Sequence, residues 1–252
     1  MFISNYYPVL ADREDQRDLI YEVKDTELKE RVDLRKWATH VENQVNLRSC
    51  TSEAVVGAYE LLLKKQYPEK LVDLSVLFVY YNARILEGAK PDFDPGVYIK
   101  DALQSVKLQG ICAESIWPYN LKQYSVVPTL ASYEDAKKRR IKNYYRCSDF
   151  DSILNALSNE IPVVVSIKIY NQFNRIGWIT STIPELQPPK EGEEPIGGHS
   201  VVLVGYDSET ERLVVRNSFG STWGDNGYFY IPYSYARTEI MDAWVFDLDL
   251  KD

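Results

Sequence analysis

The sequence predicts an α+β protein with two halves. Apolar residues recur at helical spacing in the first half, from Ser49 onward, and β-branched and aromatic residues form strand-like runs in the second half, from Pro162 onward. The chain has 252 residues, enough for one large domain or two small ones. Helices that precede strands in this way favour an α+β fold, and a cleft between the halves is the expected ligand site.

The first half is expected to contain three helices, over residues 50–66, 75–86 and 96–109. Ser49 stands in the N-cap position of the first helix, where its hydroxyl can accept a hydrogen bond from the backbone. Gly88 and Gly110 follow the other two helices, and glycine is common just past the end of a helix. Ser49, Gly88 and Gly110 therefore mark the expected ends of the helices.

The second half is expected to contain four strands after a short helix near 151–158. Their expected ranges are 162–170, 200–206, 212–216 and 228–231. The polar residues 207–211 form a turn between two of these strands, and the proline-rich residues 184–195 form a loop. Residues 1–30 show no sustained period, so they are expected to form an extension with at most a short helix near 25–31.

The charge balance excludes some function classes. The chain carries 29 Lys and Arg residues against 37 Asp and Glu residues, for a net charge of −8. It therefore lacks the positive field that non-specific nucleic-acid binding needs, and an anionic membrane surface should repel it. The basic run at 137–140 follows Glu134 and Asp135, so it is expected to be a solvated helix face.

The ends of the chain and its hydropathy bear on location. No run of 18 apolar residues is present, so no membrane span is expected. The first residues have neither the basic start nor the apolar core of a signal peptide. A cytoplasmic or otherwise intracellular location is the expectation.

The three cysteines are Cys50, Cys112 and Cys147, and this odd number does not favour a disulfide framework. The two histidines are His40 and His199, and the sequence contains no Cys-x-x-Cys pair. A zinc site is therefore not expected, and no metal or organic cofactor is predicted. Cys112 and Cys147 are interpreted as non-catalytic, and His40 as structural.

The first segment whose residues could take part in catalysis surrounds Cys50. A thiol in the first turn of a helix lies at the positive end of the helix dipole, which should favour the thiolate. Gln44, six residues earlier, carries an amide that can point to the same place as the Cys50 backbone N–H. Two donors directed at one position can stabilise an oxyanion.

Two later segments supply the other residues of the candidate catalytic site. His199 begins a predicted strand and follows two glycines, of which Gly198 allows another group to approach closely. Asn217 follows the next strand, and its side-chain oxygen can accept a hydrogen bond from an imidazole N–H. Trp223 and the glycines around it are expected to form a wall of the site. Each feature alone is more often structural, but their combination in this order is specific.

With these residues in place, the sequence resembles the papain-like cysteine peptidases. His199 lies 149 residues and Asn217 lies 167 residues after Cys50, near the spacing of that family. The resemblance includes the strand entry at 31–35 and the turn at 110–119, and it is strongest to bacterial, archaeal and viral members.

The resemblance implies a two-lobed fold with the active-site cleft between the lobes. Residues 31–125 would form a mainly helical left lobe, and residues 126–252 a right lobe like an antiparallel β-barrel. Residues 1–30 would be an extension, much shorter than the family's full inhibitory propeptides, that either lies near the cleft and inhibits or only straps the right lobe.

The resemblance also implies residue roles. Cys50 would be the nucleophile, His199 the general base and acid, Asn217 the residue that orients His199, and Gln44 the oxyanion donor. The substrate-binding residues would be Trp223, Gly96, Arg48 and Gly198. The substrate would be a polypeptide.

The sequence departs from the family pattern close to the nucleophile. Where the family usually has Cys-Gly-Ser-Cys-Trp, this chain has Leu47-Arg48-Ser49-Cys50-Thr51. Leu47 removes a disulfide partner, and Arg48 either narrows the S1 subsite or places a positive charge there. Phe219 replaces a tryptophan that shields the Asn–His hydrogen bond.

Two other classes of function stay open at this point. One is a catalytically weak protein that binds peptides or a partner, and the other is a non-proteolytic acyl-transfer enzyme with the same triad. The sequence does not indicate an oligomeric state.

Overall fold

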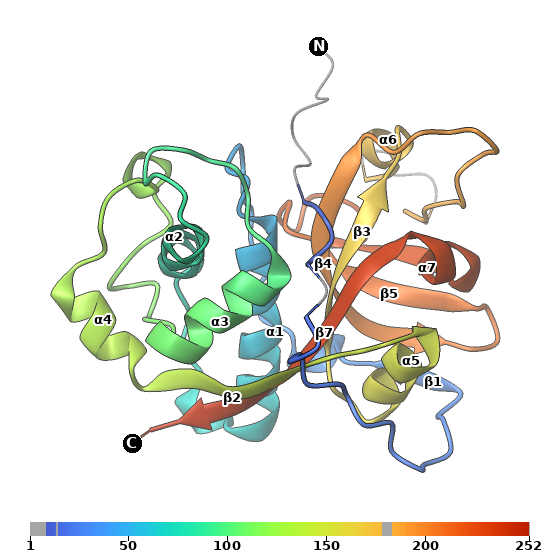
Figure 1. The fold of residues 1–252 in the computed structure, drawn as a ribbon. Coiled ribbons are helices and arrows are strands. Elements are labelled where there is room, and N and C mark those ends of the chain that lie inside the picture. Colours follow the sequence, from blue (N-terminus) through green and yellow to red (C-terminus); the bar gives the residue numbers. More distant parts are fainter. Residues whose placement is uncertain (1–8, 14, 178–182, 252) are drawn as a thin grey trace.

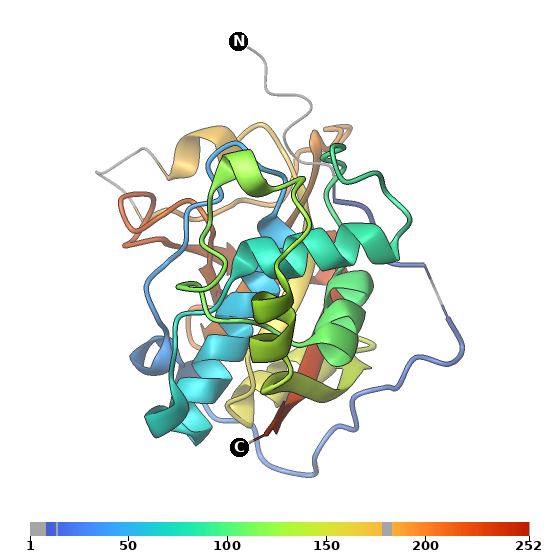
Figure 2. The same ribbon diagram turned by 90° about the vertical axis from the view of Figure 1, so that its left-hand side faces the viewer.

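The computed structural model describes residues 9–13, 15–177 and 183–251, and it has two lobes (Figure 1). The helical lobe contains α1 (Cys50–Gln66), α2 (Val76–Leu86), α3 (Ile99–Gln109) and α4 (Leu130–Ala136). Three short 3-10 helices, Arg35–Trp37, Pro68–Lys70 and Leu121–Gln123, lie in the connections. Seen from the side of this lobe, α2, α3 and α4 lie in front of α1 (Figure 2).

The sheet lobe is built on one antiparallel sheet with the strand order β2-β7-β3-β4-β5-β6, and β1 also pairs with β4. The strands are β1 (Arg31–Asp33), β2 (Arg139–Arg146), β3 (Val163–Ile169), β4 (Gly197–Asp207), β5 (Arg212–Arg216), β6 (Tyr228–Pro232) and β7 (Ile240–Leu250). Helices α5 (Phe150–Ser158), α6 (Phe173–Ile176) and α7 (Tyr233–Glu239) belong to this lobe. The predicted α+β, two-lobed fold is confirmed.

Helix α1 joins the two lobes through the core. Its residues from Cys50 to Leu63 are all buried, including the polar residues Ser52 and Glu53. The helix packs against β4 of the sheet and against α2 and α3 of its own lobe. A helix that is apolar on most sides is expected at such a central place. The N-terminus of α1 is therefore held at the junction of the two lobes.

The predicted helix bounds agree closely with the structure for the first two helices. The third begins at Ile99 rather than at 96, because Gly96 has a φ of +87°, which no α-helix accommodates. The short helix expected near 25–31 is wrong, since those residues have no helical turn. Ser49 does precede α1, but its hydroxyl makes no cap hydrogen bond.

Two strands were absent from the sequence-based prediction, β2 and β7. β2 contains four basic residues, and β7 contains three aspartates, so neither resembles an apolar run. The basic run at 137–140 is accordingly not a helix face. α4 ends at Ala136, two of the four residues follow it, and the other two begin β2. Carboxylates of Glu134 and Asp135 pair with this run.

The lobes do not divide the chain into two consecutive pieces. β1 pairs with β4, so residues 31–33 join the sheet lobe. α4 lies beside α2 and α3, although it follows residue 125 (Figures 1 and 2). Within the described ranges, no helix is both long and apolar enough to cross a bilayer.

Gly110 is expected to be among the most sensitive positions of the fold. It has a φ of +87°, and an added Cβ would overlap the carbonyl oxygen of Ala136. Gly88 has a similar φ of +81° but has no atom within 4 Å of such a Cβ. Gly110→Ala should therefore lower the free energy of unfolding by roughly 3 kcal/mol or more, and Gly88→Ala by only about 1 kcal/mol. Denaturant unfolding of both variants measures the difference, and equal losses would contradict the steric explanation.

Candidate active site

Cys50 begins α1 at the junction of the two lobes, and only 2% of its surface is exposed. The loop before it is held by polar contacts. The Ser49 hydroxyl lies 2.7 Å from the Tyr119 hydroxyl and 3.3 Å from Glu53 Oε1. The Tyr119 hydroxyl in turn donates to the carbonyl of Gln44 at 3.1 Å. The start of the helix and the loop that contains Gln44 are thus linked.

His199 lies in β4 and is 1% exposed. Its Nε2 lies 2.8 Å from Asn217 Oδ1, and Asn217 directly follows β5. The imidazole contacts two aromatic rings, Phe173 at 5.4 Å and Phe219 at 5.2 Å between centroids. Antiparallel pairing of β4 with β5 brings the two polar side chains together, although 18 residues separate them.

The residues that follow Cys50 and His199 in the sequence are in contact. Thr51 Oγ1 lies 2.9 Å from Ser200 Oγ. The backbone N–H of Ser200 faces the Cys50 thiol. The first turn of α1 therefore meets the first half of β4, and this meeting places Cys50 near His199.

Gln44 reaches the same region from the other side. Its backbone N–H donates to the Ser218 carbonyl at 3.0 Å, and its Oε1 accepts from the Ser218 hydroxyl at 2.6 Å. Its Nε2 donates to the Leu47 carbonyl at 3.0 Å, which uses one of its two amide hydrogens. The structure thus brings together the four residues predicted to act in catalysis, Cys50, His199, Asn217 and Gln44.

The ionisation of the cysteine and histidine differs from the sequence-based prediction. Burial raises the pKa of Cys50 to about 11 and lowers the pKa of His199 to about 4. A helix N-terminus stabilises an anion by only about 0.3–1 kcal/mol at an exposed site, whereas burying a charge costs several kcal/mol. Both groups are therefore neutral in this covered arrangement, and the predicted low thiol pKa is wrong for it.

Arg48 and Gly96 lie on either side of Asp94. The Asp94 carboxylate accepts from the backbone N–H of Arg48 at 3.3 Å and from the Tyr80 hydroxyl. The Arg48 guanidinium donates to the Asp94 carbonyl at 3.2 Å, and the Gly96 N–H donates to the Tyr80 hydroxyl at 3.2 Å. Asp94, which the sequence reasoning missed, thus ties the loop before Cys50 to the loop before α3.

Gly198 and Trp223 are both covered in this structure. A Cβ added to Gly198 would overlap the carbonyl oxygen of Val9, so the N-terminal part of the chain lies directly on it. Trp223 is 1% exposed and lies against Gly177 and the ring of Phe173. A substrate would reach either residue only after its cover had moved.

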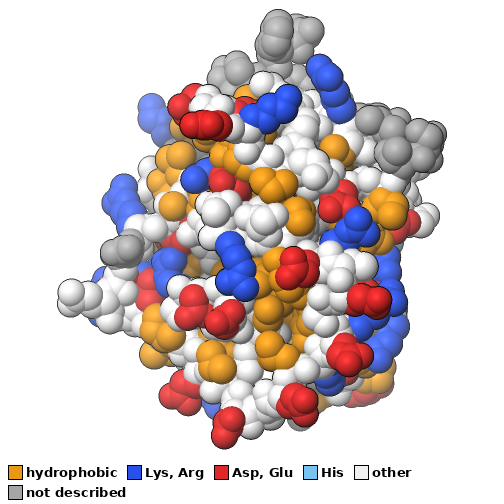
Figure 3. All heavy atoms as spheres, turned by 90° about the vertical axis from the view of Figure 1, so that its right-hand side faces the viewer, with side chains coloured by type: hydrophobic (Ala, Val, Ile, Leu, Met, Phe, Trp, Pro, Cys, Tyr) orange, Lys and Arg blue, Asp and Glu red, His pale blue; other side chains and the backbone are white. Residues whose placement is uncertain are grey.

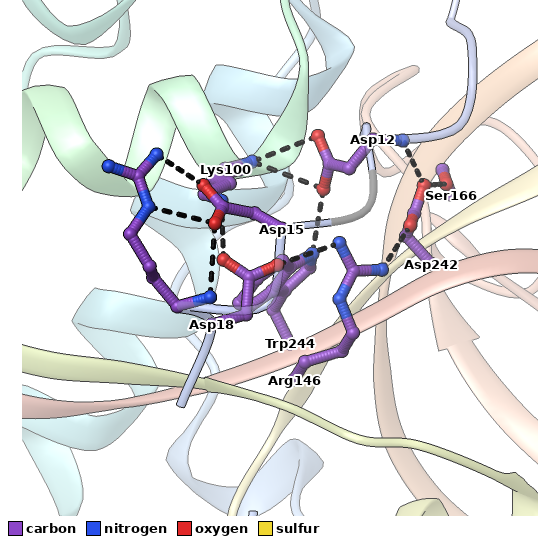
Figure 4. Close-up of polar contacts among 9 residues, drawn as sticks. Asp12, Asp15, Asp18, Lys100, Arg146, Ser166, Asp242 and Trp244 are labelled. Carbon is purple, nitrogen blue, oxygen red and sulfur yellow. Dashed lines mark hydrogen bonds and ion pairs between the residues drawn. The ribbon is translucent and has the colours of Figure 1, made fainter. Parts of the chain in front are cut away.

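The covering chain is called the strap segment here and comprises residues 9–13 and 15–21. It runs between the two lobes (Figure 1) and contacts both of them. Asp12 is its main anchor (Figure 4), because its carboxylate accepts from Trp244 Nε1 at 2.7 Å and from the Lys100 N–H at 3.2 Å. Its backbone N–H donates to Asp242 Oδ2 at 2.7 Å.

A second anchor of the strap segment is Asp18. Its carboxylate pairs with the Lys100 ammonium and with the Arg146 guanidinium, and the latter lies 2.7 Å from Asp242 (Figure 4). Lys100 belongs to α3 of the helical lobe, whereas Arg146 belongs to β2. The strap segment is thus fixed to both lobes by buried or half-buried charges. The sequence offers no local signal for this network, since its members lie up to 232 residues apart.

Other polar features lie away from this site. His40 Nε2 is 2.6 Å from Glu42 Oε1, and Asp73 brings a carboxylate oxygen within 4.8 Å of both. His40 and Glu42 are in direct contact with each other, so the grouping needs no metal ion to explain it. A cavity of about 670 Å³ is lined by Arg31, Arg35 and Arg212, and each of these arginines pairs with a carboxylate. Acidic and basic side chains are interspersed over the right-hand face of the molecule (Figure 3).

Comparison with known proteins matches residues 28–246 to the papain family cysteine proteases. An uncharacterized peptidase C1-like protein of Acanthamoeba polyphaga mimivirus is 34% identical over 230 residues, which cover 84% of this chain and 73% of that protein. A KDEL-tailed cysteine endopeptidase of Arabidopsis thaliana is 29% identical over 225 residues, which cover 82% of this chain and 55% of that protein. The chain therefore spans about half the length of the plant relative.

The structural comparison gives the same likeness. The crystal structure of xylellain, a cysteine protease from Xylella fastidiosa, superimposes with a TM-score of 0.85 at 30% sequence identity. The match covers 96% of each chain. It therefore includes both lobes.

Proposed function

The chain belongs to the papain family of cysteine proteases, a class of hydrolases, and we propose that it is an endopeptidase with Cys50 as its nucleophile. The observation that carries the proposal is the hydrogen bond of 2.8 Å between His199 and Asn217, next to a cysteine at the start of a buried helix. This bond engages Nε2 of the imidazole, and we assign Nδ1 as the nitrogen that acts on the sulfur.

The proposed reaction is acyl transfer in two steps. The Cys50 thiolate attacks a peptide carbonyl, and the oxyanion that forms accepts hydrogen bonds from the Cys50 N–H and the free N–H of Gln44. His199 gives its proton to the leaving amine, which leaves a thioester. His199 then takes a proton from water, the hydroxide attacks the thioester, and the acid product leaves as the thiol is restored.

This reaction requires a cleft that is open to solvent. Desolvation opposes the charged pair while Cys50 and His199 are buried. We therefore propose that the strap segment keeps the enzyme inactive by covering the active site. Val9 lies on Gly198, next to His199, and Asp12 and Asp18 fix the segment to both lobes.

The substrate contacts follow from the same surface. With the strap segment displaced, the backbone at Gly198 becomes available to an extended peptide. Trp223 would border the side of the leaving group once Gly177 and Phe173, which cover it, had also moved. Gly96 lies in the loop that contacts Arg48 through Asp94. We propose that Arg48 lines the S1 subsite, where it adds a positive charge.

The proposal predicts a large kinetic effect at Gln44. Gln44→Ala removes one of the two oxyanion donors and should lower kcat by about 10²- to 10³-fold, with a smaller change in KM. Asn46→Ala, in an exposed position of the same loop, is the control and should retain wild-type kcat. Steady-state hydrolysis of a fluorogenic peptide measures both. An increase in KM with kcat unchanged would exclude Gln44 as an oxyanion donor.

The decisive test of the reaction type is the fate of the acyl group. The protein is incubated with a peptide library in the presence of a labelled primary amine, and products are identified by mass spectrometry. Endopeptidase action yields internal cleavage without incorporation of the amine. Incorporation as the main product would instead favour a non-proteolytic acyl-transfer enzyme, and binding without any product would favour a peptide-binding protein.

A further inference from the structure

Glu53 is a buried carboxyl group directly beneath the proposed active site. It lies one turn into α1 after Cys50, and 4% of its surface is exposed. An unpaired buried carboxylate is costly, so this group needs either a counter-charge or a proton. Among the described residues, no salt bridge is made by Glu53, and its Oε2 has no hydrogen-bond partner.

The other oxygen of Glu53 begins a chain of contacts. Oε1 lies 3.3 Å from the Ser49 hydroxyl, which lies 2.7 Å from the Tyr119 hydroxyl, which lies 3.1 Å from the Gln44 carbonyl. Three hydrogen bonds need three protons. Serine and tyrosine supply two, and a carbonyl supplies none. All three contacts are satisfied together only when Glu53 itself is protonated.

The unpartnered Oε2 of Glu53 has a buried counterpart in the proposed triad. A cavity of about 10 Å³ is lined by Glu53, Asn217 and Ser218, and the charged residues Glu42 and Arg216 also border it. Within the described residues, Asn217 Nδ2 is likewise buried without a partner. One atom is an acceptor and the other a donor, and the space is close to that of one water molecule. A water there would join them.

We propose that Glu53 is a positioning residue, which acts on the orientation of Asn217 and on the loop of Gln44. Its carbonyl oxygen accepts through one water from Asn217 Nδ2, which keeps Asn217 Oδ1 directed at His199. Its hydroxyl donates to Ser49 and starts the chain that ends at the Gln44 carbonyl. Burial raises the pKa of Glu53 well above its usual range, and the carboxylate of Glu42 adds to this rise. Together they outweigh the lowering by the Arg216 guanidinium and by the hydrogen bonds with Ser49 and Tyr119, in agreement with a neutral acid.

The inference rests on the proposed function and makes a distinctive prediction for two substitutions. Glutamine reproduces a neutral acid, because its N–H₂ can donate to Ser49 and its oxygen can accept from the water. Glu53→Gln should therefore retain kcat within about threefold of wild type. Glu53→Leu removes both contacts and should lower kcat by roughly 10- to 100-fold, with KM changed by less than about threefold.

A double-mutant cycle shows whether Glu53 acts through Asn217. In an Asn217→Ala background, Glu53→Leu should lower kcat by a much smaller factor than in the wild type. If Glu53→Leu lowers kcat by the same factor in the Asn217→Ala background as in the wild type, the inference is overturned. A loss of more than about tenfold with Glu53→Gln would also overturn it, and this isosteric variant keeps the test valid if Glu53→Leu fails to fold.

The same cycle separates this inference from the proposed function. If Asn217→Ala strongly lowers kcat but Glu53→Leu does not, the inference fails and the proposed function stands. If Asn217→Ala leaves kcat unchanged, Asn217 does not orient His199 and the inference fails, whereas peptide hydrolysis stands. If Cys50→Ala leaves kcat unchanged, the proposed function fails. Thermal unfolding of each variant is measured alongside, so that a loss of folded protein is not taken for a loss of kcat.

Discussion

Replacing Cys50 by alanine is expected to lower kcat/KM for peptide hydrolysis by about 10⁴- to 10⁶-fold. The physical reason is that the proposed acyl-enzyme forms on the Cys50 sulfur, which alanine lacks. His199 is held by Asn217 and by two aromatic rings, so it has no freedom to act as a nucleophile in its place. Hydrolysis of a fluorogenic peptide by the purified variant measures the loss.

Cys112→Ala is the matched control, because Cys112 is also a buried free thiol. Burial raises its pKa to about 12, and the groups around it are Ser75, Asp135 and Arg139 rather than a histidine. We expect wild-type kcat/KM from this variant. Retention of substantial activity by Cys50→Ala, or an equal loss in both variants, would contradict the assignment of the nucleophile.

Releasing the strap segment is expected to give the largest gain in activity. Asp12→Ala leaves the Lys100 N–H and Trp244 without their acceptor and should increase peptide hydrolysis by roughly 10- to 100-fold, since a bound cover reduces the competent fraction of the enzyme. Asp25→Ala, at an exposed position of the same extension, is the control and should have no effect. An unchanged or lower rate in Asp12→Ala, with the protein still folded, would make the segment a structural strap.

Release of the strap segment should also depend on pH. Burial, together with the neighbouring carboxylate of Asp242, raises the pKa of Asp12 from 3.8 to about 7. The charged groups that surround Asp12 come from several elements and comprise Lys100 of α3, Arg146 of β2, Asp242 of β7, Asp18 of the strap segment and Glu87 after α2.

The direction of the pH effect follows from which state binds the proton. The docked segment keeps the Asp12 proton up to about pH 7, whereas the released segment loses it near 4. A rise in pH from about 4 to 7 therefore weakens docking, and the effect levels off above 7. Asp12→Asn cannot titrate, so the ratio of wild-type to Asp12→Asn activity should increase over this window. A flat ratio would contradict the role of Asp12.

Local patterns predicted much of the fold. α1 and α2 have clear apolar periodicity and clear ends, and β5 has a compact apolar run, so all three were placed correctly. β2 and β7 were missed because their charges resemble those of an exposed segment. In the folded chain those charges pair across long distances in the sequence, as Arg146 does with Asp242. Local periodicity contains no information on such pairs.

The site shows the same division between local and distant information. The residues that form a recognisable order, Cys50, His199 and Asn217, lie close together in the structure. Glu53 and Asp12 were not anticipated, because an acidic residue in a sequence is ordinarily assumed to be exposed. The low thiol pKa expected from the helix dipole was wrong for the same reason. Burial of Cys50 depends on contacts from β4, which begins 147 residues later.

The most direct test of the central claim is covalent labelling by a peptidyl epoxide, followed by intact mass and peptide mapping. We expect one adduct, on Cys50, that forms much more slowly in His199→Ala and faster in Asp12→Ala. Adducts distributed over Cys50, Cys112 and Cys147, or a rate that is the same with and without His199, would contradict a Cys50–His199 pair beneath a displaceable strap segment.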